Sequence, residues 1–145
     1  MKKRGDDFFY RIVDVNFNRA REGLRVCEDI SRFILKSRQL TSGLRSARHC
    51  LSRAFSEAEK REFTVSRDSA RDLGRIFTAS KVKRRDYCDV FAANMERAKE
   101  SMRVLEEFFK LVDEKTAKQF MALRYKLYSI EKNAIKKIRV ICSNR

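Results

Sequence analysis

The chain has 145 residues, of which 43% are hydrophobic and 38% are charged, and its formal net charge is +15. This length suits one domain with a core of its own, and polar residues interrupt every apolar stretch, which excludes a membrane-spanning helix. No apolar segment follows the charged start Met1–Asp7, so we expect no signal peptide and a cytoplasmic location. The positive charge predicts an anionic partner: nucleic acid, a membrane surface or phosphorylated small molecules.

Little in the chain breaks a helix, because it has no proline and only four glycines. The first helix is expected to start at Asp6 or Asp7, or else after an N-cap at Asp14, and to end near Lys36–Gln39. A turn at Thr41–Gly43 would then lead into the second helix.

The remaining elements follow the same helical spacing of apolar residues. The second helix is expected over about 44–62, and residues 63–85 are irregular by pattern. The third helix should run from Asp86 to about Val112, and the fourth from about Thr116 to Val140. The sequence thus predicts an all-α chain that forms a single domain over 1–145.

A polar motif occurs twice, at a constant offset. Residues 16–29 read Asn-x-x-Arg-Ala-x-Glu-x-Leu-Arg-Val-x-Glu-Asp, and residues 94–107 read Asn-x-x-Arg-Ala-x-Glu-x-Met-Arg-Val-x-Glu-Glu. Such a repeat indicates a repeated structural unit, which we interpret as a helical hairpin over about 8–62 and again over about 86–140. Two hairpins predict four long antiparallel helices in a pseudo-two-fold bundle, with an irregular connection at 63–85.

The polar residues of this motif lie on or beside the apolar face of their helices. With Asn16 at 0° on a helical wheel, the apolar arc spans roughly 260° through 0° to 100°, with Arg19 inside it and Glu22 at its border. The second copy repeats the pattern with Asn94, Arg97 and Glu100. Polar groups directed at a core need partners, so these residues either form buried ion pairs that fix the helix register or line a wet cavity.

The predicted topology favours the cavity. In an up-down-up-down bundle the first and third helices run parallel across a diagonal, so both polar sets face each other at one end. The 63–85 connection would close that end with Arg67, Asp68, Asp72, Gly74 and Arg85. Arginine binds phosphate oxygens and carboxylates hold Mg²⁺. The sequence therefore predicts a phosphate site, built without a P-loop or any other common phosphate-binding motif.

Two further acidic residues predict ion pairs between helices. Counting back from the turns places Glu28 near Arg48. The same count places Glu106 near Arg103 and Arg124 in the second copy. We interpret both sets as structural pairs in the middle of the bundle.

The cysteines and the single histidine carry no recognisable site motif. Cys27, Cys50, Cys88 and Cys142 show no metal-ligand spacing and are predicted to be reduced thiols, packed as small hydrophobic side chains. The repeat partner of His49 is Tyr125, so a satisfied interhelical histidine is favoured over a general base.

A first basic stretch, Lys81–Arg85, is a candidate nucleic-acid patch, and a second, Lys132–Arg139, is a candidate for contact with RNA or a membrane surface. A solvated helix face is the simpler interpretation of the second stretch.

Taken in order, the polar motifs resemble a known family. The resemblance rests on five strings: Asp14-x-Asn16-x-Asn18-Arg19-Ala20-x-Glu22-Gly23-Leu24-Arg25-Val26-x-Glu28-Asp29, Leu44-Arg45-x-x-Arg48-His49, Arg67-Asp68-Ser69-x-x-Asp72-x-Gly74, Arg85-Asp86-x-x-Asp89-Val90-x-x-x-Asn94 and Arg124-Tyr125-x-x-Tyr128-x-x-Glu131-Lys132. They are similar to the helical domain often fused in front of thiamin-phosphate synthase. The likeness covers about residues 10–132.

That domain is similar to the alternative hydroxymethylpyrimidine-phosphate kinases of thiamin biosynthesis, which use ATP to convert hydroxymethylpyrimidine phosphate into its diphosphate. The resemblance therefore implies an ATP-dependent kinase with Mg²⁺ as cofactor, in a fold unlike the ribokinase fold usual for this step. Two features depart from the family pattern: Arg75 follows Gly74, and no synthase domain follows Arg145. The second would make this a stand-alone copy or a domain.

The resemblance also carries over candidate site residues. Arg19 and Arg97 would hold phosphates, and Asp68 or Asp72 would hold Mg²⁺. Glu22 or Glu100 would orient the attacking phosphate or accept a hydrogen bond from the aminopyrimidine. The remaining substrate-binding candidates are Asn16, Arg67 and Asn94.

Two other functions stay open. One is a non-catalytic helical partner of thiamin-phosphate synthase. The other is a basic helical nucleic-acid-binding protein, which is disfavoured because the repeated arginines point toward the apolar arc rather than outward.

Overall fold

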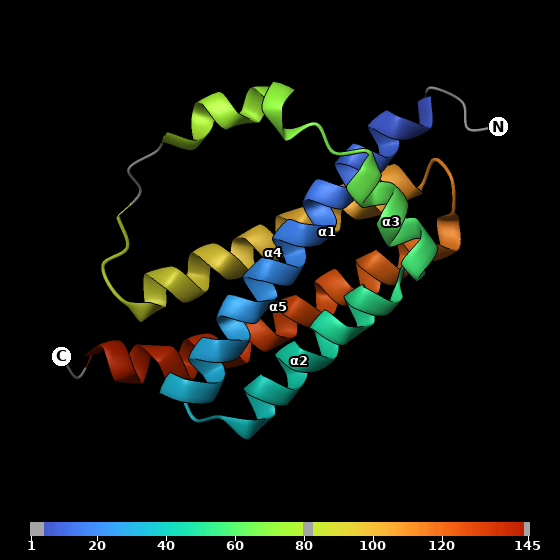
Figure 1. Ribbon diagram of the computed structural model, residues 1–145. Helices are drawn as coiled ribbons and strands as arrows, with labels where there is room; N and C mark the ends of the chain where they lie inside the picture. Colours follow the sequence, from blue (N-terminus) through green and yellow to red (C-terminus); the bar gives the residue numbers. More distant parts are fainter. Residues whose placement is uncertain (1–4, 80–82, 144–145) are drawn as a thin grey trace.

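The computed structural model describes residues 5–79 and 83–143, and within them every regular element is helical. The α-helices are α1 (Gly5–Asp29), α2 (Arg38–Arg53), α3 (Glu57–Val65), α4 (Tyr87–Phe109) and α5 (Glu114–Ser143) (Figure 1). The predicted all-α class is confirmed. No described helix has both the length and the apolar composition needed to cross a membrane.

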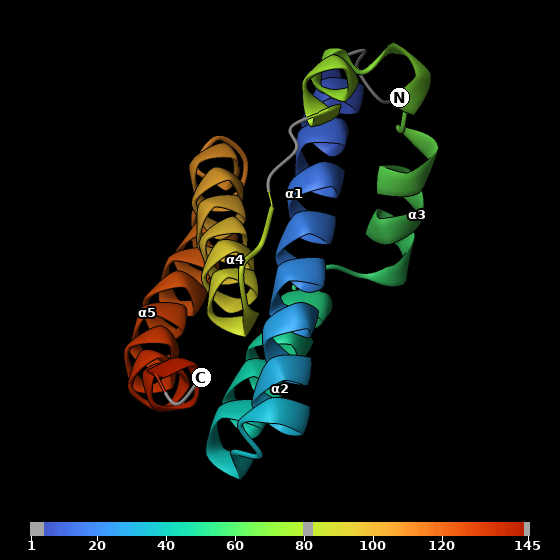
Figure 2. The same ribbon diagram turned by 90° about the vertical axis from the view of Figure 1, so that its left-hand side faces the viewer.

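The four longest helices form a ring in which each packs on two neighbours. Helix α1 packs against α2 and α4, and α5 packs against the same two helices. The chain runs in opposite directions in each neighbouring pair, as Figures 1 and 2 show. The buried apolar residues of all four helices meet inside this ring and form one core.

The contact between α1 and α4 corrects the predicted arrangement. These two helices are antiparallel neighbours and do not run parallel across a diagonal: Gly23 lies against Asn94 and Ala98, and Cys27 lies against Phe91. A Cβ atom at Gly23 would stand 2.6 Å from the carbonyl oxygen of Asn94. The small residues of the repeated motif therefore let the two backbones approach closely, which makes this pair adjacent.

The connection between α2 and α4 also differs from the prediction. It begins with α3, whose Phe63 packs on the rings of Tyr10, Phe17 and Phe55. It continues through two 3-10 turns, Ser69–Arg71 and Leu73–Ala79, and returns to the start of α4 at the opposite end of the bundle (Figure 1). The described parts of the connection, residues 63–79 and 83–85, therefore lie along the bundle and do not close one end of it.

Helix α1 runs unbroken through Asp14 and ends in a π-helical turn at Ile30–Ile34, so Asp14 is no N-cap. Helix α2 begins at Arg38 because the Ser37 side chain accepts a hydrogen bond from the Leu40 N–H. The predicted turn at Thr41–Gly43 is thus wrong, since these residues lie inside α2.

The expected helix over 44–62 is two helices. Helix α2 ends at Arg53, and α3 starts after Ser56, whose hydroxyl accepts from the Glu59 N–H at 3.2 Å. The Glu59 carboxylate accepts in return from the Ser56 N–H at 2.7 Å. This reciprocal capping box supplies a new helix start, which interrupts the expected continuous helix.

The predicted interhelical ion pairs are confirmed. Glu28 is 5% exposed and accepts from Arg48 at 2.8 Å. Glu106 is 2% exposed and accepts from Arg124 and from Arg103, each at 2.9 Å. The pairs Glu28–Arg48 and Glu106–Arg124 each join the two long helices of one hairpin, whereas Arg103 and Glu106 lie on the same helix, α4.

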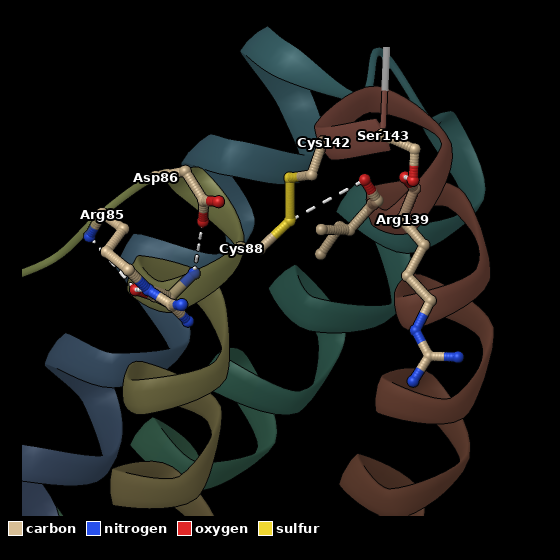
Figure 3. The surroundings of a disulfide bond; sticks show 8 residues. Arg85, Asp86, Cys88, Arg139, Cys142 and Ser143 are labelled. Carbon is tan, nitrogen blue, oxygen red and sulfur yellow. Dashed lines mark hydrogen bonds and ion pairs between the residues drawn. A yellow bond between two sulfur atoms is a disulfide. The ribbon is translucent and has the colours of Figure 1, made fainter. Parts of the chain in front are cut away.

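The cysteine prediction holds only in part. Cys88, in the first turn of α4, and Cys142, near the end of α5, form a disulfide (Figure 3). Both were expected to be reduced, but the antiparallel packing of α4 and α5 brings together two thiols 54 residues apart. Cys27 is free and buried, and Cys50 is free and half-buried.

Two smaller expectations are also resolved. His49 lies on the exposed face of α2, so the predicted interhelical contact does not form. On α5, Ala134 and Ile138 are buried while Lys132, Lys136 and Arg139 are exposed, which is the solvated helix face expected for 132–139. Of the basic run at 81–85, residues 81 and 82 lie outside the described residues.

Candidate functional site

One cavity of about 970 Å³ gathers much of the predicted polar set. It opens between the first half of α1, the 67–73 part of the connection and one side chain of α4. Its lining residues are Phe8, Arg11, Ile12, Asp14, Val15, Asn18, Arg19, Glu22, Arg67, Asp68, Ser69, Arg71, Asp72, Leu73 and Arg97. The volume is at the upper end of the roughly 300–1,000 Å³ usual for small-molecule sites.

The cavity has an apolar side and a charged side. Phe8, Ile12, Val15 and Leu73 supply the apolar lining. Five arginines and four acidic residues supply the charged lining. A ligand that carries both a ring and anionic groups matches this division.

Two contacts attach the connection to α1 and so build the cavity wall. Arg67 donates to both carboxylate oxygens of Asp14, at 2.6 and 2.8 Å. The Arg11 guanidinium donates to the Ser66 carbonyl at 2.7 Å. The hydrogen bond to Asp14 raises the pKa of Arg67. The guanidinium of Arg67 is therefore engaged in holding the wall.

The two predicted metal ligands are also engaged. The Asp68 carboxylate lies 2.9 Å from Arg71 and 3.7 Å from Arg11. One oxygen of Asp72 accepts from the Gly74 N–H at 2.8 Å. Asp68 thus faces two cations, and Asp72 caps the start of the following turn.

Arg19, Glu22 and Arg97 are exposed, so the expectation that the repeated arginines point toward the core is wrong, and with it the argument against a nucleic-acid surface. Their side chains form no ion pair or hydrogen bond among the described residues. All three belong to the repeated motif, and all three line the cavity. Arg19 and Arg97 occupy equivalent positions in α1 and α4, and the antiparallel contact at Gly23 brings both to the same side of the bundle. Two unpaired guanidinium groups in one cavity form an anion-binding arrangement.

The other predicted site residues lie elsewhere. Asn16 and Asn94 each donate to the carbonyl four residues earlier in their own helix, at 2.9 and 2.8 Å. Neither lines the cavity, and Glu100 is exposed outside it. Of the nine candidates the structure brings Arg19, Glu22, Arg67, Asp68, Asp72 and Arg97 together.

Asp14, Arg11 and Arg71 line the cavity but were not among the predicted site residues. On the helical wheel Asp14 falls at about 160°, outside the apolar arc, so its pattern is that of a solvated residue. Its partner Arg67 is 53 residues away. The one signal in the sequence was the position of Asp14 at the head of the first polar motif.

Among the described residues, no three carboxylates lie close enough together to share a metal ion. Within this part of the chain, the one group of three side chains close enough to share a metal ion is Asp86, Cys88 and Cys142. Two of these are joined in the disulfide. The fold is thus a helical bundle, and its cavity of about 970 Å³ is lined by both basic and acidic side chains.

The chain belongs to the ThiD2 family, whose sequence profile matches residues 11–133. It is 38% identical over 121 residues to the thiamine-phosphate synthase of Synechococcus sp. (strain CC9605), covering 83% of this chain and 34% of that protein. It is 39% identical over 120 residues to the thiamine-phosphate synthase of Rhodopirellula baltica, covering 82% of this chain and 32% of that protein.

A third relative, the thiamine-phosphate synthase of Nostoc sp. (strain PCC 7120), is 35% identical over 133 residues, or 91% of this chain and 37% of that protein. The chain therefore spans about a third of the length of these relatives. No solved structure matches it. The link to a thiamine-phosphate synthase domain, predicted from the ordered polar motifs, is confirmed, and the kinase reaction stays a prediction.

Proposed function

We propose that this protein is a kinase of thiamine biosynthesis that transfers the γ-phosphoryl group of ATP to hydroxymethylpyrimidine phosphate. The observation that supports this most directly is the pair Arg19 and Arg97, unpaired in one cavity of about 970 Å³ that also has an apolar side. The relatives named thiamine-phosphate synthase support a role in thiamine biosynthesis.

In the proposed reaction an ionised phosphate oxygen of the pyrimidine phosphate attacks the γ-phosphorus of ATP. The bond from the γ-phosphorus to the β–γ bridging oxygen breaks, ADP leaves, and the product is the pyrimidine diphosphate. Because the nucleophile is already charged, the reaction needs no strong base. It needs the two anions to be held in line and their charge to be offset.

The unpaired residues have roles that suit this reaction. Arg19 and Arg97 bind the phosphates of the two substrates and reduce their mutual repulsion. Glu22 accepts from the exocyclic amino group of the pyrimidine. The apolar side formed by Phe8, Ile12, Val15 and Leu73 contacts the ring.

Mg²⁺ usually accompanies ATP, and its predicted ligands do not fit that role in this arrangement. Asp68 is neutralised by Arg71 and Arg11, and one oxygen of Asp72 is used by Gly74. Asp68 faces two cations that compete with a metal ion, and no third carboxylate among the described residues completes a site with it and Asp72, so we assign no protein ligand to Mg²⁺ and derive no step through it. The phosphates of ATP are themselves ligands for Mg²⁺.

The deciding experiment measures ADP formation by the full chain with ATP, Mg²⁺ and hydroxymethylpyrimidine phosphate. Arg19→Ala and Arg97→Ala should each lower kcat/KM by about 100-fold, the usual loss when one preorganised charge donor is removed. Arg61→Ala, in the exposed part of α3, is the matched control and should leave the rate unchanged. Circular dichroism should report the same helix content in all variants.

Full turnover in both cavity variants would reject the assignment of the site. A purified chain without turnover that still raises the melting temperature of a thiamine-phosphate synthase would favour the non-catalytic partner, an alternative supported by the names of the relatives.

A further inference from the structure

A second hollow lies beyond the C-terminal end of α1, away from the candidate site. It has a volume of about 410 Å³ and lies between the π-helical turn Ile30–Ile34 and the first turns of α2. Four basic residues line it: Arg32, Lys36, Arg38 and Arg45. The candidate site uses α1 residues from Phe8 to Glu22, so the two sites share no residue.

The four cations have no acidic partner. No Asp or Glu lines the hollow, and within the described part of the chain none of the four forms an ion pair. Arg32 makes only a cation–π contact, 4.8 Å from the ring centre of Phe33. The positive charges around this hollow repel each other, and a bound anion would offset that repulsion.

The corresponding turn in the second hairpin is built differently. Between α4 and α5, Lys110 lies 2.7 Å from Glu107 and 3.7 Å from Glu106. Just beyond that turn, Lys118 lies 2.7 Å from Glu114. Lys110 and Lys118 of this turn region thus have acidic partners, whereas none of the four cations around Ser37 has one within the described part of the chain.

Hydrogen-bond donors surround the same place. Lys137 of α5 reaches over from the neighbouring helix and donates to the Ser37 hydroxyl at 3.0 Å, which adds a fifth cation at the edge. The exposed Ser42 hydroxyl also lines the hollow. Three guanidinium groups, two ammonium groups and a hydroxyl form a donor set for several tetrahedral oxygens.

We propose that this hollow binds a small anion with two or more phosphate groups, such as a diphosphate or triphosphate. One singly charged anion would leave most of the positive charge uncompensated, whereas a linear polyphosphate matches it. The guanidinium forks of Arg32, Arg38 and Arg45 bind phosphate oxygens, and Lys36 adds a compact charge. The proposal does not depend on whether the chain is a kinase.

The test is a calorimetric titration of the full chain with inorganic pyrophosphate. The parent protein carries Arg19→Ala and Arg97→Ala, so that the first cavity does not contribute. We expect the parent to bind one pyrophosphate per chain. Adding Arg38→Ala and Arg45→Ala should weaken this binding by about ten-fold or more. The matched control adds Arg53→Ala and Arg61→Ala, which remove the same charge from exposed positions on α2 and α3.

If the hollow variant and the control variant lose the same pyrophosphate affinity, only net charge matters and the proposal is overturned. A parent that binds no pyrophosphate would overturn it as well. Single-stranded RNA that binds to these arginines and is not displaced by pyrophosphate would also overturn it, in favour of a nucleic-acid surface. If the parent does not fold, the unmodified chain serves: Arg38→Ala with Arg45→Ala should then remove one pyrophosphate site, and Arg53→Ala with Arg61→Ala should not.

Discussion

Cys27 lies fully buried in α1, with its sulfur 3.5 Å from the carbonyl oxygen of Phe91 in α4. Burial raises the pKa of its thiol from 9.0 to about 12, and the negative charge of Glu131 adds to the shift. The neutral thiol is therefore strongly preferred in the folded protein. Cys50, by contrast, is free and half-buried on α2.

We predict that iodoacetamide labels Cys50 and leaves Cys27 unmodified in the native protein, as measured by mass spectrometry. Because the folded pKa is raised, the thiol's contribution to stability is complete below the unfolded pKa of 9.0 and is lost as pH rises toward about 12. Urea midpoints should thus fall less steeply above pH 9 in Cys27→Ala than in the unmodified protein. Equal labelling of both cysteines would contradict this.

The sequence predicted the positions of some cavity residues and not of others. The repeated motif led us to select Arg19 and Glu22, because their copies Arg97 and Glu100 repeat polar character that packing alone does not require, and both residues line the cavity. Asp14 was not predictable in this way, since its buried position depends on Arg67, which is distant along the chain. Glu100 was predicted together with its counterpart Glu22, but only Glu22 lines the cavity.

At the scale of elements, each hairpin is held by an acidic residue of its first helix and an arginine of its second. Glu28 pairs with Arg48, and Glu106 with Arg124. In the second pair, 3% of the Glu106 side chain and 12% of the Arg124 side chain are exposed. Loss of one partner leaves the other charge largely desolvated.

We predict that Glu106→Leu lowers the free energy of unfolding by about 3 kcal/mol, because Arg124 then lacks its partner. The double variant Glu106→Leu with Arg124→Met should recover most of that loss, since no unpaired charge remains. Glu107→Leu, at the exposed neighbouring position, should change stability by less than about 0.5 kcal/mol. Urea denaturation measures all three; a double variant no more stable than Glu106→Leu would refute the role of the pair.

Helix boundaries were predictable where a local signal stood alone. The N-cap Asp86 marked the start of α4. The capping pair Ser56 and Glu59 was also present in the sequence, but the helical spacing of apolar residues around it continues across the break between α2 and α3. The apolar periodicity therefore predicted one continuous helix, and the capping residues were the one sequence signal of the break.

For the whole molecule, the disulfide joins the first turn of α4 to the last turns of α5 (Figure 3). It closes a loop with a sequence separation of 54 residues, which includes most of the second hairpin. Cross-linking so long a segment restricts the unfolded chain more than the folded one.

We predict that reduction, or Cys88→Ser, lowers the free energy of unfolding by about 4 kcal/mol, the chain-entropy value for a loop of this length. Cys50→Ser is the control and should have little effect, because Cys50 forms no disulfide. Urea denaturation with and without a dithiol reductant gives the comparison. Identical midpoints in the two conditions would mean that the bond does not constrain the unfolded chain.

The sequence by itself determined the helical class, the repeated polar motif, the family and the two interhelical ion pairs. These depend on spacing along one helix or across one short turn, which the order of residues specifies directly. Only the tertiary structure decided that α1 and α4 are antiparallel neighbours, that the connection runs along the bundle and that Cys88 meets Cys142. Those facts depend on which distant surfaces pack together. For α1 and α4 the physical reason is visible, because Gly23 has no side chain and lies against the backbone of Asn94.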